Sequence, residues 1–304
     1  MNANNKKENG MIDHNDAGRL IIDFHTHTFP DSLAKRAVDK LSQAANLKNY
    51  LDGTFFDLKK SMQRSGIHYS VLLPVATKPE HYKNINMIAK EVNSTSKYNQ
   101  LISFGSLHPD NANYKDIICD LADYRVPGIK LQPINQLRDI DNISYLRMID
   151  YAVSKGLFVL IHAGFDISSP DADFASVTKL KNVVDKINSD NIILAHMGGF
   201  NEWDLVEDLI VGKNVLLDTS FTITPLRHIS PDGQISFSED GYLKMEQFVR
   251  IIRNHGVKRI LFGSDSPWSD QHESLKMIQK SPLTDEEKAL ILGGNAKKML
   301  MEWL

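Results

Sequence analysis

Eight short apolar runs recur along the chain, and the segments between them carry apolar residues at helical spacing. Most of the runs are almost continuously apolar, which is typical of parallel strands covered by helices on both faces. Between the fifth and sixth runs, residues 174–187 place apolar side chains at steps of three, one and four, on one face of a helix. The runs are 20–25 (LIIDFH), 69–75 (YSVLLPV), 101–107 (LISFGSL), 128–131 (GIKL), 157–162 (LFVLIH), 191–196 (NIILAH), 214–218 (NVLLD) and 259–262 (RILF).

This alternation predicts an α/β fold, a (β/α)8 TIM barrel. Dividing 304 residues among eight strand-helix units gives 38 residues each, and such barrels commonly use about 250 residues as one domain. Residues 1–18 are polar, rich in Asn and Lys, and have no apolar stretch resembling a signal core, so we expect a flexible N-terminal tail. Residues 19–304 are then expected to form a single TIM-barrel catalytic domain.

The composition disfavours several classes of partner. The chain has 35 Lys+Arg against 38 Asp+Glu, a net charge of -3, and no local basic run, so we do not expect it to bind nucleic acid. No apolar stretch is long enough to predict a membrane span. Cys119 is the single cysteine and cannot form an internal disulfide, so the cytoplasm is the expected compartment. We expect a small-molecule substrate, and the sequence leaves a homo-oligomer open.

Five side chains suited to binding a metal fall at the carboxyl ends of predicted strands. His25 and His27 end the first, His162 ends the fifth, His196 ends the sixth, and Asp265 follows the eighth. Strand alternation points His25 and His27 to the same side, and the carboxyl ends of barrel strands meet at one mouth. Imidazoles with one carboxylate suit Zn²⁺ or another first-row divalent ion rather than Ca²⁺ or Mg²⁺. The alternative, structural histidines at strand ends, is disfavoured by this convergence.

The same residues lie in segments that resemble a known family. IIDFHTH, GIKLQP, LIHAG, ILAHMGG, ILFGSDSPW and ILGGNAKKML are similar to segments of the amidohydrolase superfamily, specifically amidohydrolase family 2, a branch of metal-dependent TIM-barrel hydrolases and decarboxylases. The resemblance covers residues 21–300. It implies that His25, His27, His162 and Asp265 are metal ligands and that His196 lies beside the metal-bound water.

This ligand set predicts a specific chemistry. A metal ion lowers the pKa of its bound water towards about 7. Asp265 could accept the water's proton and return it to the leaving group, while His196 stabilises the developing oxyanion. We expect one divalent transition metal, Zn²⁺ first and Mn²⁺ as the alternative, rather than two. Asp23 points the same way as His25 if the strand is regular, and it either supports the ligands or is an ordinary polar strand residue.

Lys130, in the fourth run, has three interpretations. In binuclear relatives within the resembled superfamily, a lysine ending this strand is carboxylated and bridges two metals. The alternatives are a salt bridge inside the barrel and a cationic contact to an anionic substrate. GIKLQP resembles the version of the branch with one metal, so we favour the unmodified lysine. Arg227, in the turn-rich connection 219–241, and Trp268, after Asp265, are the other candidate substrate contacts.

The leading functional hypothesis is a metal-dependent hydrolase of a small, carboxylated amide, lactone or ester. The nearest alternative is a non-oxidative, metal-dependent decarboxylase of an aromatic or enoic acid, because the same ligand set supports both reactions within the resembled branch. A remote alternative is a non-catalytic barrel that acts as a binding protein. Residues that would separate the two reactions lie in loops that the sequence alone does not place.

Overall fold

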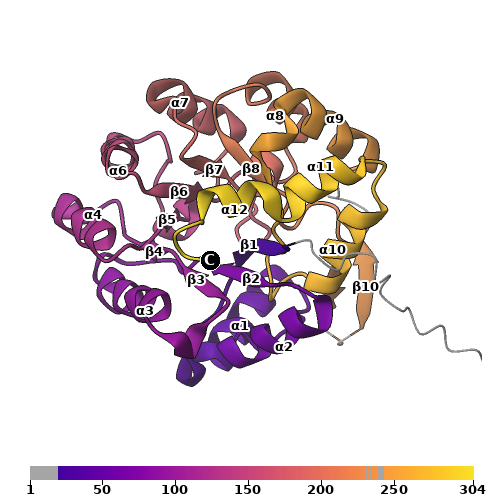
Figure 1. Ribbon diagram of the computed structural model, residues 1–304, viewed down its shortest axis with the longest axis horizontal. Coiled ribbons are helices and arrows are strands. Elements are labelled where there is room, and N and C mark those ends of the chain that lie inside the picture. Colours follow the sequence, from indigo (N-terminus) through magenta and orange to yellow (C-terminus); the bar gives the residue numbers. More distant parts are fainter. Residues whose placement is uncertain (1–19, 231, 233, 239–242) are drawn as a thin grey trace, which may run out of the picture.

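The computed structural model describes residues 20–230, 232, 234–238 and 243–304 (Figure 1). The tail predicted for residues 1–18 lies outside the described residues. The strands are β1 (Ile22–Thr26), β2 (Tyr69–Leu72), β3 (Leu101–Ser103), β4 (Gly105–Ser106), β5 (Gly128–Leu131), β6 (Phe158–Ile161), β7 (Ile192–Leu194), β8 (Leu216–Asp218), β9 (Leu226–Ile229), β10 (Ile235–Ser238) and β11 (Ile260–Leu261). The α-helices are α1 (Asp31–Ala45), α2 (Phe55–Ser65), α3 (Tyr82–Ser94), α4 (Tyr114–Asp123), α5 (Pro133–Gln136), α6 (Ile143–Ser154), α7 (Val177–Ile187), α8 (Trp203–Leu209), α9 (Met245–His255), α10 (Gln271–Lys280), α11 (Asp285–Ala289) and α12 (Asn295–Met299).

The parallel strands follow one another around a ring in chain order, with helices outside it (Figure 1). β1, β2 and β3 form one parallel set, and β4, β5, β6, β7, β8 and β11 form the other. Phe104 joins the sets between β3 and β4, because its N–H donates to Leu72 O (3.0 Å). At the other seam, Phe24 N–H donates to Phe262 O, directly after β11 (2.7 Å). The predicted third run is therefore two short strands interrupted at Phe104, and the order is that of a (β/α)8 barrel.

Apolar side chains fill two layers, one inside the ring and one between strands and helices. The inner cluster takes every second residue of a strand, as in Ile22 and Phe24 of β1 or Ile102 and Phe104 around β3. In β5 the intervening residues Ile129 and Leu131 belong to the outer cluster. The alternation in β5 therefore turns Lys130 towards the inside of the barrel.

The connection after β8 holds a two-stranded antiparallel hairpin, β9 and β10, which the sequence did not predict. Two backbone hydrogen bonds attach it to the segment after α1: Lys48 N–H donates to Arg227 O (2.7 Å), and Ile229 N–H donates to Asn46 O (2.9 Å). The connection after β1 and the connection after β8 therefore meet. Part of the turn-rich connection predicted for residues 219–241, including Pro231 and Gly233, lies outside the described residues.

The last helices close the amino-terminal end of the barrel. Thr284 and Glu287 form a capping box at the start of α11. Gly293 and Gly294 do not interrupt the chain here, because residues 290–294 form a π-helical turn that runs directly into α12. A Cβ on Gly293 would lie 1.9 Å from Leu20 O, so glycine is required there by the close approach of the backbone before β1.

His255 lies in the interior of the protein. It ends α9 and is fully inaccessible to solvent. Gly212 N–H donates to its Nδ1 (3.2 Å), so its Nε2 carries the proton and donates to Val215 O (2.9 Å). Burial lowers the pKa of His255 to about 4.

None of the described helices combines the length and hydropathy that crossing a membrane requires.

Because the pKa of His255 falls from 6.5 to about 4 on folding, the neutral ring stabilises the fold above pH 6.5, and this contribution is lost as pH falls towards 4. The difference corresponds to about 3 kcal/mol. As the pH falls from 6.5 to 4, the unfolding free energy of the wild type should decrease by about 3 kcal/mol more than that of His255→Gln. Urea titrations at several pH values measure it, and parallel curves for the two proteins would contradict it.

Candidate metal centre and cavity

A cavity of about 510 Å³ opens at the carboxyl ends of the barrel strands. It is lined by every residue predicted to bind or activate a metal, together with Lys130 and Trp268. α1 contributes one wall through apolar residues and Lys40, so the long connection after β1 shapes the site. The predicted metal-site residues in the lining are His25, His27, His162, His196 and Asp265.

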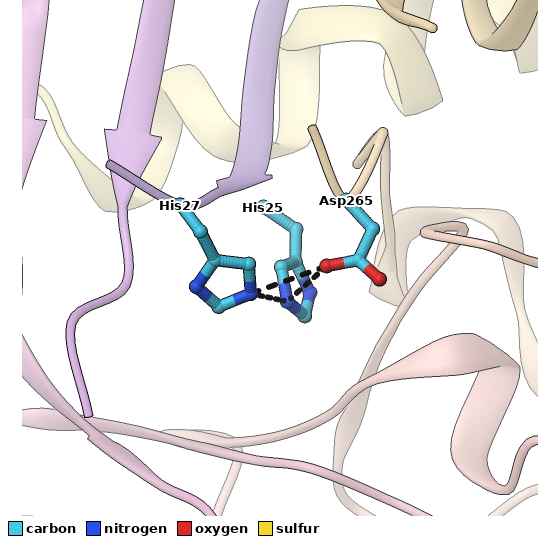
Figure 2. A group of neighbouring side chains, drawn as sticks. All are labelled: His25, His27 and Asp265. Atoms are coloured by element: carbon cyan, nitrogen blue, oxygen red, sulfur yellow. Dashed lines mark hydrogen bonds and ion pairs between the residues drawn. The ribbon is translucent and has the colours of Figure 1, made fainter. Parts of the chain in front are cut away.

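His25, His27 and Asp265, which line this cavity, lie close together with their side chains pointing towards one another (Figure 2). Nε2 of His25 lies 3.2 Å from Nε2 of His27 and 3.4 Å from Oδ1 of Asp265. Nε2 of His27 lies 3.1 Å from the same oxygen. One candidate ligand atom from each residue lies within 4.8 Å of the other two, which is close enough for one ion to contact all three.

Hydrogen bonds on the far side of each ring fix which nitrogen faces the group. His27 Nδ1 lies 2.8 Å from Leu73 O, a carbonyl that only accepts, so Nδ1 carries the proton. His25 Nδ1 lies 2.8 Å from Oδ2 of Asp218 and donates to it in the same way. Both Nε2 atoms therefore present lone pairs to the centre of the group.

This donor set fits a divalent transition metal. Two imidazole lone pairs and a carboxylate oxygen repel one another at about 3 Å unless a cation lies between them. His162 supplies a further donor in the same cavity, since its buried Nε2 has no hydrogen-bond partner among the described residues. Nitrogen and carboxylate ligands of this kind suit Zn²⁺ or Mn²⁺ better than Ca²⁺.

His196 connects His162 to the rest of the site. Its Nδ1 lies 3.0 Å from the carbonyl oxygen of Ser220, so Nδ1 carries the proton. Its Nε2 is then an acceptor and lies 3.1 Å from Nδ1 of His162. His162 donates from Nδ1 and keeps its Nε2 unprotonated.

The pKa values of the group favour metal binding. Burial and the neighbouring charge of Lys130 lower the pKa of His25 to about 4, and burial holds the pKa of His162 well below its usual range. Burial opposes ionisation of Asp265, but His25 and His27 beside it lower its pKa below the usual range. At neutral pH the rings of His25 and His162 are uncharged and the carboxylate of Asp265 is ionised, which is the state a metal ion requires.

Backbone conformations aim Asp265 and His196 into the cavity. Both residues have left-handed backbone angles, with φ of 68° at Asp265 and 57° at His196, which cost energy in residues other than glycine. Gly263 allows the chain before Asp265 to approach β1, because a Cβ there would lie 2.8 Å from Cβ of His25. Strain of this kind is commonly stored where a side chain must be aimed.

Asp23 ties the two metal-bearing segments together from outside the group. Its buried carboxylate accepts from Ser264 N–H (2.9 Å), from Ser264 Oγ (2.6 Å) and from Gln271 Nε2 (2.8 Å). It makes no contact with the ligand side chains of His25 or Asp265 in the described structure. A shift of strand register between Asp23 and Thr26 explains this, because the regular alternation on which the prediction depended is interrupted there.

Lys130 lines the same cavity and is almost completely buried. In the described part of the chain its Nζ has no hydrogen bond or carboxylate within 4.0 Å, so the predicted alternative of a salt bridge inside the barrel does not form. Burial lowers the pKa of Lys130 to about 8, although Asp218, Asp265 and Asp166 favour the charged form. A buried cation facing a cavity is suited to bind an anionic ligand.

The structure separates the two other predicted substrate contacts. Trp268 lines the cavity. Arg227 does not, because it lies in β9 and its guanidinium packs over the ring of Tyr50, 4.4 Å from the ring centre. Asp218 and Ser220, which contact the histidines from behind, were not predicted as site residues. Asp218 could have been found, since it ends the seventh predicted strand as the histidines end theirs.

Several solved proteins share the fold of this chain. No curated protein matches the chain in sequence. 5-Carboxyvanillate decarboxylase from Sphingomonas paucimobilis superposes with a TM-score of 0.63 at 13% identity, covering 93% of this chain and 99% of that one. A dihydroxybenzoic acid decarboxylase from Polaromonas, with bound manganese and 2-nitroresorcinol, gives 0.64 at 13%, covering 93% and 97%.

A probable 2-pyrone-4,6-dicarboxylic acid hydrolase from Acinetobacter baumannii, with citric acid bound, gives a TM-score of 0.62 at 13% identity, covering 92% of this chain and 99% of that one. At such identities these similarities establish the fold, which is the predicted TIM barrel. The model of one sequence family, described as amidohydrolase, matches residues 22–301, nearly the whole chain. The chain therefore belongs to the amidohydrolase family.

Proposed function

We propose that this protein is a metal-dependent hydrolase of a small, carboxylated amide, lactone or ester. The observation that carries the proposal is the convergence of Nε2 of His25, Nε2 of His27 and Oδ1 of Asp265 in a cavity that also holds a buried lysine. In this proposal residues 19–304 act as one catalytic domain. A non-catalytic binding barrel would need neither the aimed carboxylate nor its left-handed backbone.

Four residues would hold the ion: His25, His27, His162 and Asp265. We propose a single ion, Zn²⁺ or Mn²⁺, and the manganese in the Polaromonas decarboxylase supports the second choice. When bound, a divalent ion supplies Lewis acidity and makes water a stronger nucleophile at neutral pH. The unmodified Lys130 would place a positive charge beside any second ion, which disfavours a second site.

Asp265 is the proposed general base. Its Oδ1 contacts both imidazoles, and its Oδ2 has no hydrogen-bond partner among the described residues, so Oδ2 can accept a proton from water (Figure 2). The ionised state of Asp265 suits it to this step. The same oxygen can then return the proton to the leaving group.

His196 is placed to act only after a change of protonation. In its neutral form both ring nitrogens are engaged, Nδ1 with Ser220 O and Nε2 with His162 Nδ1. It can stabilise an oxyanion from Nε2 only as the imidazolium, when His162 no longer donates to that atom. The proposed role of His196 therefore depends on the substrate or on proton transfer within the cavity.

Lys130 and the aromatic wall are proposed to recognise the substrate. The Lys130 ammonium would bind a substrate carboxylate, since no side chain in the described structure neutralises it within 4.0 Å. The remaining cavity surface includes flat apolar side chains that suit a planar ring. These are Phe29, Phe165, Phe200, Phe221 and Trp268.

The second candidate is non-oxidative decarboxylation of an aromatic or enoic acid. The aromatic wall favours it, as does the similarity of the fold to decarboxylases of 5-carboxyvanillate and dihydroxybenzoic acid. A panel of carboxylated aromatic, lactone, amide and ester substrates separates the two reactions. Hydrolysis produces an amine, an alcohol or a ring-opened acid without carbon dioxide, whereas decarboxylation releases carbon dioxide.

Metal loading is the first expected outcome. Purified protein reconstituted with Zn²⁺ or Mn²⁺ should bind about one ion per chain. Because the ion binds the folded state, saturation at about 1,000 times Kd should raise the free energy of unfolding by about 4 kcal/mol, and a chelator should reverse the accompanying rise in Tm. Elemental analysis and calorimetry measure this, with Mg²⁺ as a control of weaker effect. No bound ion after reconstitution would contradict the metal site.

Asp265→Asn should retain the fold and lower kcat by at least about 10²-fold, because an amide cannot accept the water proton. Asp110→Asn is a matched control, since Asp110 pairs with Arg138 on the surface and does not line the cavity. Steady-state kinetics with the substrate identified from the panel measure both variants. A kcat within about threefold of the wild type would remove Asp265 from proton transfer.

Lys130→Ala should raise KM for an anionic substrate by about 10-fold or more and leave metal content unchanged, since a hydrogen bond to a charged group contributes about 1.5–3 kcal/mol. The wild-type KM should rise above about pH 8, where Lys130 loses its proton, and the variant should not show this rise. Loss of a metal ion together with most of kcat would instead indicate a carboxylated, bridging Lys130.

A further inference from the structure

Asp218 is a buried carboxylate behind the metal group, and its two oxygens have different tasks. Oδ2 accepts from His25 Nδ1 (2.8 Å). Oδ1 accepts from the N–H groups of His196 (3.1 Å) and Ser220 (3.0 Å) and from the Ser220 hydroxyl. Four donors from three segments thus meet on one carboxylate that solvent does not reach.

Ser220 lies between the rings of His25 and His196. Its Oγ is 2.9 Å from His25 Nδ1 and 3.0 Å from His196 Nδ1, while its hydroxyl proton is directed to Asp218. An oxygen that gives its own proton to Asp218 can only accept from the two imidazoles. Both Nδ1 atoms are therefore held in the protonated form, that of His196 also by the Ser220 carbonyl oxygen (3.0 Å), and both Nε2 atoms are left unprotonated.

The arrangement extends to His162 through one further hydrogen bond. Because His196 Nε2 is unprotonated, it accepts from His162 Nδ1 (3.1 Å). His162 then presents an unprotonated Nε2, the buried atom with no hydrogen-bond partner in the described structure. The acceptors supplied by Asp218 and Ser220 thus determine which ring nitrogen carries the proton in three histidines, His25, His196 and His162.

We propose that Asp218 and Ser220 are positioning residues that set the tautomers of His25, His196 and, through His196, His162. This inference rests on the proposed metal centre and adds residues that do not themselves bind the ion. Carboxylates behind metal-binding histidines contribute about 10–100-fold to metal affinity. Here the carboxylate of Asp218 accepts hydrogen bonds from His25, a proposed ligand, and from the backbone of His196, the histidine proposed to stabilise the oxyanion.

Asp218→Asn tests the proposal because an amide has only one oxygen. If that oxygen faces His25, the amide NH2 opposes the three donors at the other end; if it is turned away, His25 Nδ1 loses its acceptor. We expect the Kd for Zn²⁺, measured by competition with a chromogenic chelator, to rise about 10–100-fold. Thr222→Val is the matched control: it removes a buried hydrogen bond of the same loop, from Thr222 Oγ1 to Thr219 O (2.7 Å), that contacts none of the histidines. Its Kd should stay within about threefold of the wild type.

Nitrogen-15 NMR of the histidine rings in the full-length wild-type protein provides a second test that needs no foldable variant. With Zn²⁺ bound, the ring protons of His25 and His196 should be on Nδ1, and His196 should keep this tautomer without the ion. A proton on Nε2 of His196, or an unchanged Kd in a folded Asp218→Asn protein, would overturn the inference. A wild-type protein that binds no ion would instead refute the proposed function, while the His196 tautomer would still decide the role of Ser220.

Discussion

Electron-pair donors are held facing one another in the barrel mouth, and this constraint organises the site. Nε2 of His25, Nε2 of His27 and Oδ1 of Asp265 lie 3.1 to 3.4 Å apart, although none has a proton to share once the far nitrogen of each ring is engaged. Such an arrangement is unfavourable without a cation. A cation between the three atoms would be coordinated by them and would remove the repulsion. The rest of the barrel holds the three donors in this arrangement.

The ligands are held in this way because β1 and the segment after β11 are neighbours in the ring of strands. β1 and the segment after β11 are far apart in sequence but joined by backbone hydrogen bonds at the seam, including Asp265 N–H to His25 O (2.8 Å). Asp23 adds a side-chain connection across the same seam to Ser264. The strained backbone of Asp265 is thus fixed on both sides, and its carboxylate is held in place before any ion binds.

The fold could be predicted from the sequence because parallel strands buried on both faces leave almost continuous apolar runs, and each of the eight runs contains barrel-strand residues. The convergence of His25, His27 and Asp265 could be predicted as well, since the topology alone brings the carboxyl ends of strands together. The shift of register after Asp23 could not, because a bulge changes the direction of side chains without changing the pattern of residue types. The pairing of β9 with residues 46–48 and the burial of His255 depend on contacts between distant segments, which local periodicity does not encode.

Anomalous diffraction from crystals of the zinc-loaded protein would locate the ion and identify its ligands. We expect a single peak at the barrel mouth, with Nε2 of His25, His27 and His162 and a carboxylate oxygen of Asp265 each about 2.0–2.2 Å from the ion. We also expect Asp218 to accept the Nδ1 proton of His25 on the other side of the ring. A peak elsewhere, an ion bound through Nδ1, or two ions bridged by a modified Lys130 would contradict the proposed one-metal site.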